Sequence, residues 1–180
     1  MIRILRKNKK KNPHFENKVE LLLKPYNPTN IKFIDEGFHG EIYSFINNSN
    51  RLKSGKYVIK ILRTALSSDD RAYLKSLSNH GLIPKVYEIK EYYYIMKFVN
   101  AKTLDSIYTK FSKSDLKIIV NEIKKLVAIW HKLGYAHGDI NTRNIMITES
   151  GKIYIIDPIL TEFAEDVDYI EDLYYDLNLK

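Results

Sequence analysis

The feature that most constrains the fold of this chain is an apolar stripe at helical spacing in its second half. Residues 112–115 read Ser-Lys-Ser-Asp, which is a capping box that begins a helix. Gly134 is typical of the residue just beyond a helix end. Apolar residues recur between these signals at i, i+3, i+4 and i+7: Leu116, Ile119, Val120, Ile123, Leu126, Val127, Trp130 and Leu133. A helix with so regular an apolar face buries it, so we predict a core helix here.

The first half of the chain predicts a small antiparallel sheet. Alternating segments at residues 31–36 and 41–46 flank a glycine turn and read as a β-hairpin. A third strand is expected at residues 55–63, and two more strands at residues 85–90 and 92–99. These five segments, with one helix between the third and the fourth, predict a small antiparallel sheet that carries one helix.

Helices and one further hairpin surround this sheet in sequence. A short helix is expected at residues 15–24, and Ser67-Ser68-Asp69-Asp70 supplies the N-cap of a second helix. After the core helix, residues 145–148 and 152–156 predict another hairpin, and residues 161–176 an acidic helix. The first half therefore carries strands with one helix among them, and the second half is mostly helical.

Bulk composition excludes several classes of protein. The 180 residues can bury one core or two small lobes, and the absence of cysteine excludes a disulfide framework. No apolar run approaches the roughly 20 residues of a membrane span, and no cleavable signal peptide is readable. The net charge of +7 combines a basic segment, residues 1–12, with an acidic one, residues 161–180, so it does not indicate a nucleic-acid-binding face. We expect a cytoplasmic protein, of its own cell or of a host cell, with secretion by a non-cleaved signal left open.

One polar loop carries residues suited to phosphoryl transfer. His137, Asp139 and Asn144 follow the core helix, and Asp157 follows the next hairpin. One loop can present the Asp139 and Asn144 side chains together, and residues 145–156 fold back to return Asp157 beside them. A carboxylate facing an acceptor hydroxyl, with an amide and a carboxylate for Mg²⁺, is complementary to bound ATP·Mg²⁺.

The order of these patterns resembles the protein-kinase-like superfamily over roughly residues 31–160. The resemblance implies an α+β, two-lobe fold, with an antiparallel N-lobe sheet carrying one helix and a reduced, mostly helical C-lobe. It implies an N-lobe at residues 15–99 and a truncated C-lobe at residues 100–180. The basic charges near the start of the chain predict a flexible leader at residues 1–14. The C-lobe would hold the catalytic loop and an acidic tail.

The resemblance also implies roles for individual residues. Asp139 matches the catalytic base, Lys60 the lysine that contacts the α- and β-phosphates, and Asp70 the helix acid that pairs with this lysine. Asn144 and Asp157 match the metal ligands and complete the catalytic set. The implied ATP-binding residues are Gly37, Gly40, Ile42, Val58, Lys60, Met96, Phe98 and Met146.

Several positions depart from the kinase pattern. Asp35 stands where the first loop glycine would be and should crowd or repel a triphosphate, and Val58 replaces the usual alanine against the adenine. Asn141 occupies the position of the lysine that steadies the transferred phosphate. Gly138 replaces an arginine, as in the small tRNA-modification-complex kinases and the aminoglycoside phosphotransferases. Asp157-Pro158-Ile159 lacks the Phe and Gly of Asp-Phe-Gly, and the short segment that follows is similar to truncated secreted effector kinases.

The resemblance therefore predicts a minimal atypical kinase that uses ATP and Mg²⁺ to phosphorylate Ser or Thr of a protein, with a protein partner required for full activity. One alternative is a pseudokinase that binds nucleotide weakly and acts as a protein-interaction scaffold. Another is a small-molecule phosphotransferase, favoured by the His-Gly-Asp sequence. Nucleic-acid binding through residues 1–12 has the least support.

Overall fold

The computed structural model describes residues 13–37, 39–158 and 166–179 of the chain. Most of the expected leader and the start of the acidic tail lie outside these residues. Contacts divide the chain into two compact units, which are described one at a time. Unit 1 holds the described residues up to Ala65 together with Tyr87–Met96, and unit 2 holds Leu66–Val86 together with the described residues from Lys97 onward.

The first sheet has five strands in the order β1-β2-β3-β5-β4. Their bounds are Thr29–Gly37 for β1, Gly40–Asn47 for β2, Gly55–Leu62 for β3, Val86–Ile89 for β4 and Tyr93–Lys97 for β5. β2 lies at the centre of an antiparallel trio, pairing with β1 on one side and with β3 on the other. The antiparallel sheet expected from alternating residues is therefore confirmed.

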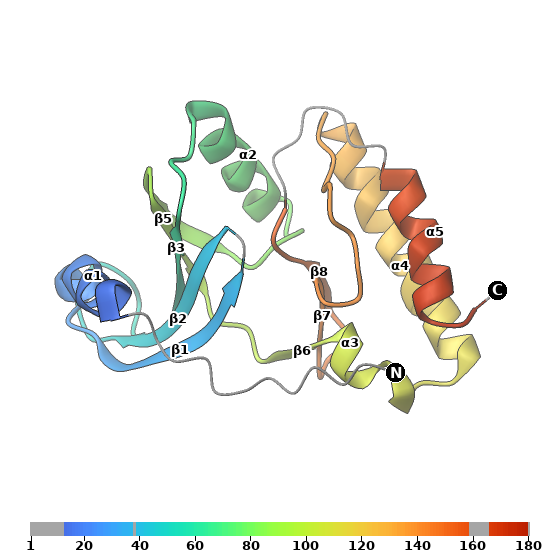
Figure 1. The fold of residues 1–180 in the computed structure, drawn as a ribbon, viewed down its shortest axis with the longest axis horizontal. Helices are drawn as coiled ribbons and strands as arrows, with labels where there is room; N and C mark the ends of the chain where they lie inside the picture. Colours follow the sequence, from blue (N-terminus) through green and yellow to red (C-terminus); the bar gives the residue numbers. More distant parts are fainter. Residues whose placement is uncertain (1–12, 38, 159–165, 180) are drawn as a thin grey trace. The chain divides into compact units, whose positions relative to one another are not determined.

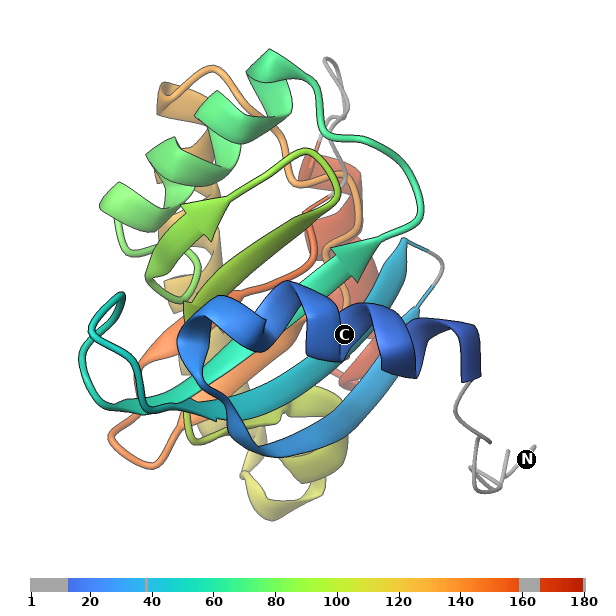
Figure 2. The same cartoon turned by 90° about the vertical axis from the view of Figure 1, so that its left-hand side faces the viewer.

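Helix α1, Pro13–Leu23, lies across one face of this sheet (Figure 2) and leads into a short 3-10 turn, η1, Lys24–Tyr26. Leu23 and Tyr26 are almost fully buried in an apolar core shared with the strands. The other members of this core are Val19, Tyr43, Phe45, Tyr57, Ile59, Ile61 and Ile95. Because side chains alternate along a strand, the neighbours of these strand residues point to the opposite face of the sheet.

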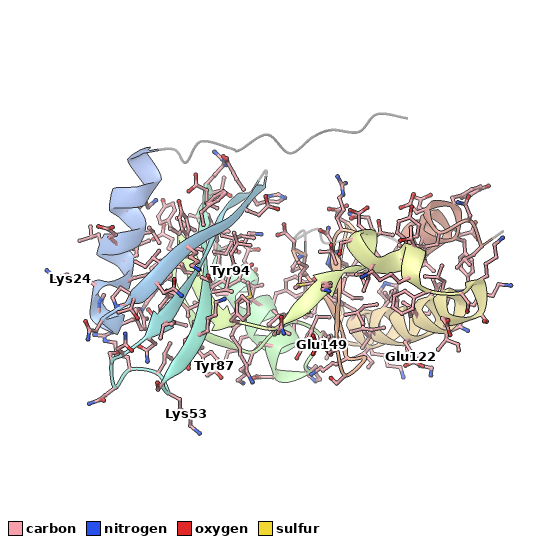
Figure 3. All side chains as sticks on the ribbon, turned by 90° about the horizontal axis from the view of Figure 1, so that it is seen from below. Lys24, Lys53, Tyr87, Tyr94, Glu122 and Glu149 are labelled. Carbon is pink, nitrogen blue, oxygen red and sulfur yellow. The ribbon has the colours of Figure 1, made fainter. Side chains whose placement is uncertain are left out.

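Unit 2 is built around the predicted core helix, α4, Lys113–Lys132. The capping box is present as expected, with the Ser112 hydroxyl accepting from the Asp115 N–H and the Asp115 carboxylate accepting from the Ser112 N–H. Helix α5, Asp166–Asp176, runs beside α4 (Figure 1) and its Leu173 is fully buried. The opposite face of α4 carries exposed charges such as Glu122 (Figure 3), which pairs with Lys125 at 2.6 Å.

The remaining elements of unit 2 position the polar loop. α2, Ser68–Asn79, begins at the predicted N-cap, and α3, Leu104–Ile107, precedes a 3-10 turn, η2, Tyr108–Lys110. A small antiparallel sheet has the order β6-β7-β8, with bounds Ala101–Thr103, Ile145–Thr148 and Ile153–Ile155. Among the described helices, none combines the length and the apolar composition that a membrane crossing requires.

The α+β class is confirmed, with differences in detail. The first helix begins at Pro13 rather than at residue 15, and β5 ends at Lys97 rather than at residue 99. The short elements β6 and α3 were not predicted. Contacts group α2 with unit 2, although it was assigned to the N-lobe by its place in the sequence. The lobe boundaries at residues 14, 99 and 180 stay a prediction.

Candidate active site

A buried histidine supports the loop that joins α4 to β7. His137 has no exposed surface, and its Nε2 lies 3.0 Å from the carbonyl oxygen of Ile156. Its Nδ1 accepts a hydrogen bond of 3.2 Å from the backbone N–H of Asp139. One ring nitrogen donates and the other accepts, which is the neutral imidazole with its proton on Nε2. His137 therefore holds the two backbone segments that precede Asp139 and Asp157.

A second buried hydrogen-bond chain fixes this loop against two helices. The indole Nε1 of Trp130 donates to the hydroxyl of Tyr73 at 2.6 Å, and that hydroxyl donates to the carbonyl oxygen of Ala136 at 2.9 Å. The ring of His137 packs edge-to-face on Trp130 with centroids 5.0 Å apart. Tyr73 of α2 and Trp130 of α4 thus hold the start of the loop from two sides.

Two amide side chains hold the carboxylate of Asp139. Asn141 Nδ2 donates to Asp139 Oδ1 at 2.7 Å, and Asn144 Nδ2 donates to Asp139 Oδ2 at 2.8 Å. Asn144 Nδ2 also lies 2.8 Å from the Asp139 carbonyl oxygen. Both carboxylate oxygens therefore have a donor, and each keeps a further lone pair for another hydrogen bond.

Backbone hydrogen bonds bring Asp157 to the same loop. The N–H of Ile156 donates to the carbonyl oxygen of Asn144 at 2.7 Å, and the carbonyl oxygen of Ile156 faces His137. Asp157 follows with a left-handed backbone, φ 63°, which is uncommon for a residue with a side chain and is frequent at functional sites. The structure thus brings Asp139, Asn144 and Asp157 together; the chemical roles assigned to them stay predictions.

The oxygen atoms of this cluster fit a magnesium ion. Because Asn144 Nδ2 is used by Asp139, the planar amide directs its Oδ1 away from that carboxylate. Within the described ranges, no three His, Cys, Asp or Glu side chains could together hold a metal ion. The Mg²⁺ that the kinase resemblance implies would take the Asn144 amide oxygen and the Asp157 carboxylate, with phosphate and water as the other oxygen ligands; this assignment stays a prediction.

The candidate nucleotide residues of unit 1 share one face of its sheet. Ile42 lies opposite Lys60, and Ser44 lies opposite Val58, in the β2–β3 pair. Residues directly opposite in a ladder point to the same side. Because α1 covers the face that carries Tyr43, these residues line the other face. Lys60 and Val58 are buried, with 4% and 7% of their surface exposed.

The two glycines of the β1–β2 turn meet different demands. A Cβ at Gly40 would lie 2.0 Å from the carbonyl oxygen of Ile61 in β3, so any side chain at this position collides with the sheet. A Cβ at Gly37 would meet no atom within 4 Å. Of these two positions, only position 40 requires glycine, and Gly37 leaves open space above the backbone.

Asp35 lies on the same face of the sheet as Ile42 and Lys60. The β1–β2 register shifts between Phe33 and Asp35, and Asp35 then lies opposite Ile42. Its Oδ1 accepts a 2.9 Å hydrogen bond from the N–H of Glu36. The carboxylate is thus held by its own strand, on the face where Lys60 is located.

The other predicted residues occupy separate places. Met96 is in β5, Phe98 follows that strand, and Met146 in β7 lies opposite Tyr154. The carboxylate of Asp70 accepts from the N–H of the N-cap residue of α2 at 2.8 Å. Lys60 belongs to unit 1 and Asp70 to unit 2, so their pairing stays a prediction, as does a nucleotide site built from both units.

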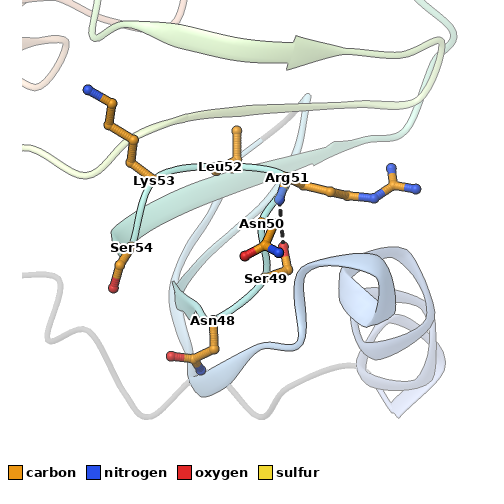
Figure 4. A pocket seen from close by; sticks show the side chains of 7 residues that line it. All are labelled: Asn48, Ser49, Asn50, Arg51, Leu52, Lys53 and Ser54. Atoms are coloured by element: carbon orange, nitrogen blue, oxygen red, sulfur yellow. Dashed lines mark hydrogen bonds between the residues drawn. The ribbon is translucent and has the colours of Figure 1, made fainter.

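A surface hollow in unit 1 does not belong to the candidate site. It is lined by Asn48, Ser49, Asn50, Arg51, Leu52, Lys53 and Ser54 of the β2–β3 loop (Figure 4). The buried Asn47 supports this loop, because its Nδ2 donates to the carbonyl oxygens of Leu52 at 2.8 Å and Ser49 at 3.0 Å. None of the candidate site residues is among its lining, so we assign it to the shape of the turn.

The bonding role of Asn141 was missed in the sequence. Asn141 was noted only as the replacement of a lysine, whereas its side chain holds Asp139 and accepts a 3.0 Å hydrogen bond from the N–H of Arg143. An asparagine that accepts from the N–H two residues onward is a common loop motif, and this signal was readable. The Tyr73–Trp130 contact joins residues distant in sequence and had no such signal.

A model of the RIO domain matches residues 29–159. The chain is also similar to the KEOPS complex subunit Bud32 of Pyrococcus abyssi, with 27% identity over 88 residues. That match covers 48% of this chain and 40% of the relative, so the chain spans about two fifths of the length of the curated relative it matches.

Proposed function

We propose that this chain, which belongs to the RIO domain family of atypical protein kinases, is a phosphotransferase that uses ATP and Mg²⁺. Membership of the protein-kinase-like superfamily, expected from the order of motifs, is confirmed by the family match and by the similarity to Bud32. The observation that carries the proposed activity is the convergence of Asp139, Asn144 and Asp157 in unit 2.

Each of these residues has a distinct part in the proposed reaction. Asp139 accepts the proton of the acceptor hydroxyl as that oxygen bonds to the γ-phosphorus and the bond from phosphorus to the bridging oxygen breaks. When bound, ATP·Mg²⁺ supplies the phosphoryl group and compensates its charge. Asn144 and Asp157 hold the metal, and Lys60 contacts the α- and β-phosphates. Gly37, with its open space, lets the backbone approach the phosphates.

We further propose that the acceptor is Ser or Thr of a protein and that full activity requires a partner protein. The family is one of protein kinases, and the similar protein Bud32 is a subunit of the KEOPS complex. We also propose that the chain acts in the cytoplasm of its own cell or of a host cell, where ATP is available.

Radiolabelled ATP tests the activity. The full chain should transfer the γ-phosphate, to itself or to proteins of a cell lysate, in a Mg²⁺-dependent way, and Asp139→Ala and Lys60→Ala should each abolish the transfer. Glu149→Ala is the matched control, because this exposed acid in the β7–β8 turn (Figure 3) has no role in the proposed site. Transfer that persists in both site variants refutes the proposal.

A pseudokinase is the second candidate. Asp35 puts a carboxylate on the face of the sheet that carries Lys60, and Asn141 puts no positive charge where the protein-kinase pattern has a lysine. A thermal-shift assay separates the two readings. Under the kinase proposal ATP raises the melting temperature only with Mg²⁺, whereas a pseudokinase should show little stabilisation or one indifferent to Mg²⁺.

A small-molecule phosphotransferase is the third candidate, and the His137-Gly138-Asp139 sequence favours it. Labelled phosphate recovered on a small hydroxyl compound, with none on protein, would support that reading. Label on Ser or Thr, identified by phosphoamino-acid analysis, would support the protein-kinase proposal.

A further inference from the structure

Both polar atoms of the Asn141 side chain make hydrogen bonds inside the loop that joins α4 to β7. Its Nδ2 donates to Asp139 Oδ1 at 2.7 Å, and its Oδ1 accepts from the N–H of Arg143 at 3.0 Å. Its carbonyl oxygen accepts from the N–H of Asn144 at 3.0 Å. One residue therefore contacts the carboxylate, the turn that follows it and the residue that offers the metal ligand.

We propose that Asn141 is a positioning residue that sets the orientation of the Asp139 carboxylate for proton transfer; this inference rests on the proposed function. A donor on one oxygen alone leaves a carboxylate free to rotate about its Cβ–Cγ bond. Donors on both oxygens fix its plane, because rotation would break one bond or the other. Asn144 supplies the second donor. The free lone pairs of Asp139 then point in fixed directions, which the transfer of a proton from an acceptor hydroxyl requires.

Substitutions at Asn141 separate this positioning from a simple loop-shaping role. Asn141→Asp keeps the oxygen that accepts from Arg143 N–H, so the turn survives, but it replaces the donor to Asp139 by a second carboxylate. Asn141→Ser keeps a hydroxyl that can both accept in the turn and donate to Asp139. Asn141→Ala removes both bonds without adding charge. The neighbouring Thr142→Ala is the matched control, because no hydrogen bond of the Thr142 side chain occurs among the described residues.

Steady-state kinetics of the full chain measures the effect. We expect Asn141→Ala and Asn141→Asp to lower kcat about 10-fold or more while KM for ATP changes less than about 2-fold. Asn141→Ser should recover part of kcat, and Thr142→Ala should match the wild type. A loop-shaping role alone predicts wild-type kcat in Asn141→Asp, and that result would overturn the proposal.

A second measurement does not depend on activity. In ¹⁵N-resolved NMR spectra, the side-chain amides of Asn141 and Asn144 should both shift in Asp139→Ala, because each loses its carboxylate acceptor. If the wild type transfers no phosphate, the proposed function fails and these spectra alone decide on the positioning. An Asn141 amide unchanged in Asp139→Ala would overturn the positioning even if the chain is an active kinase.

Discussion

The hydroxyl of Tyr73 links two buried polar groups of unit 2, so its removal should destabilise this unit. Tyr73 and Trp130 are buried, with 3% and 0% of their surfaces exposed. Tyr73→Phe keeps the ring and its packing but removes the acceptor of the Trp130 indole N–H and the donor to the Ala136 carbonyl oxygen. Two buried polar groups would then lose this partner.

Leaving a buried donor or acceptor without a partner costs about 1–3 kcal/mol. Two such groups, partly relieved by local relaxation, give an expected loss of about 2–4 kcal/mol in the free energy of unfolding. For a chain of this length, 1 kcal/mol corresponds to about 2–4 °C in Tm, so we expect Tm to fall by about 4–16 °C.

Urea unfolding followed by tryptophan fluorescence measures this change, because Trp130 is the only tryptophan of the chain and lies at the site of the perturbation. Tyr135→Phe is the matched control. Its ring packs on Tyr73 with centroids 4.3 Å apart, and its hydroxyl makes no hydrogen bond among the described residues. The control should lie within about 0.5 kcal/mol of the wild type. Equal stabilities for Tyr73→Phe and Tyr135→Phe would refute the reasoning.

Three further predictions concern other parts of the structure. Gly40→Ala should lower the free energy of unfolding by about 2–4 kcal/mol in chemical denaturation, because the new Cβ meets a β3 carbonyl oxygen. Gly37→Ala should keep the stability of the wild type and raise KM for ATP. Equal losses of stability in the two variants would contradict this. Burial, the hydrogen bond to Glu88 and its charge raise the pKa of Tyr93 to about 12. The contribution of Tyr93 to stability is therefore present below the unfolded pKa of about 10 and is lost as the pH rises toward 12. Glu88→Gln should lower the pKa of Tyr93 in an NMR titration, and an unchanged Tyr93 pKa would contradict this prediction. Asp139→Asn should slow phosphate transfer at least about 100-fold in the radiolabel assay. The carboxylate of Asp139 accepts from the side-chain amides of Asn141 and Asn144, and the new asparagine would turn its own N–H toward one of these two donors. Near-normal transfer would exclude Asp139 as the base.

Elements encoded by local patterns were predictable from the sequence. The capping box at Ser112 and the apolar stripe of α4 lie within a few turns of one another, so each can be recognised without knowledge of the rest of the fold. The hairpin of β7 and β8 is also local, and its return of Asp157 to the loop of Asp139 follows from a short turn. The clustering of these acids needed no information about distant contacts.

Features that depend on distant partners were not predictable. β6 has three residues, too few to show an alternation, and it exists because Lys102 pairs with Ile147 far along the chain. The shifted register that puts Asp35 on the same face of the sheet as Lys60 depends on its β2 partner, Ile42. The attachment of α2 to unit 2 through Tyr73 likewise depends on Trp130, which no spacing in α2 reveals.

The two terminal helices have a consequence for how the protein can be cut into fragments. The RIO domain match covers residues 29–159 and leaves out both α1 and α5. Yet Leu23 and Tyr26 are buried in the core of the first sheet, and Leu173 is buried in α5, a helix that contacts α4. Each such side chain contributes about 1.5–3 kcal/mol by burial, so a fragment trimmed to the family boundaries would uncover apolar surface on each unit. The stretch needed for stable expression is therefore longer than the stretch that defines the family, and fragments for crystallisation or NMR should begin before α1 and end after α5.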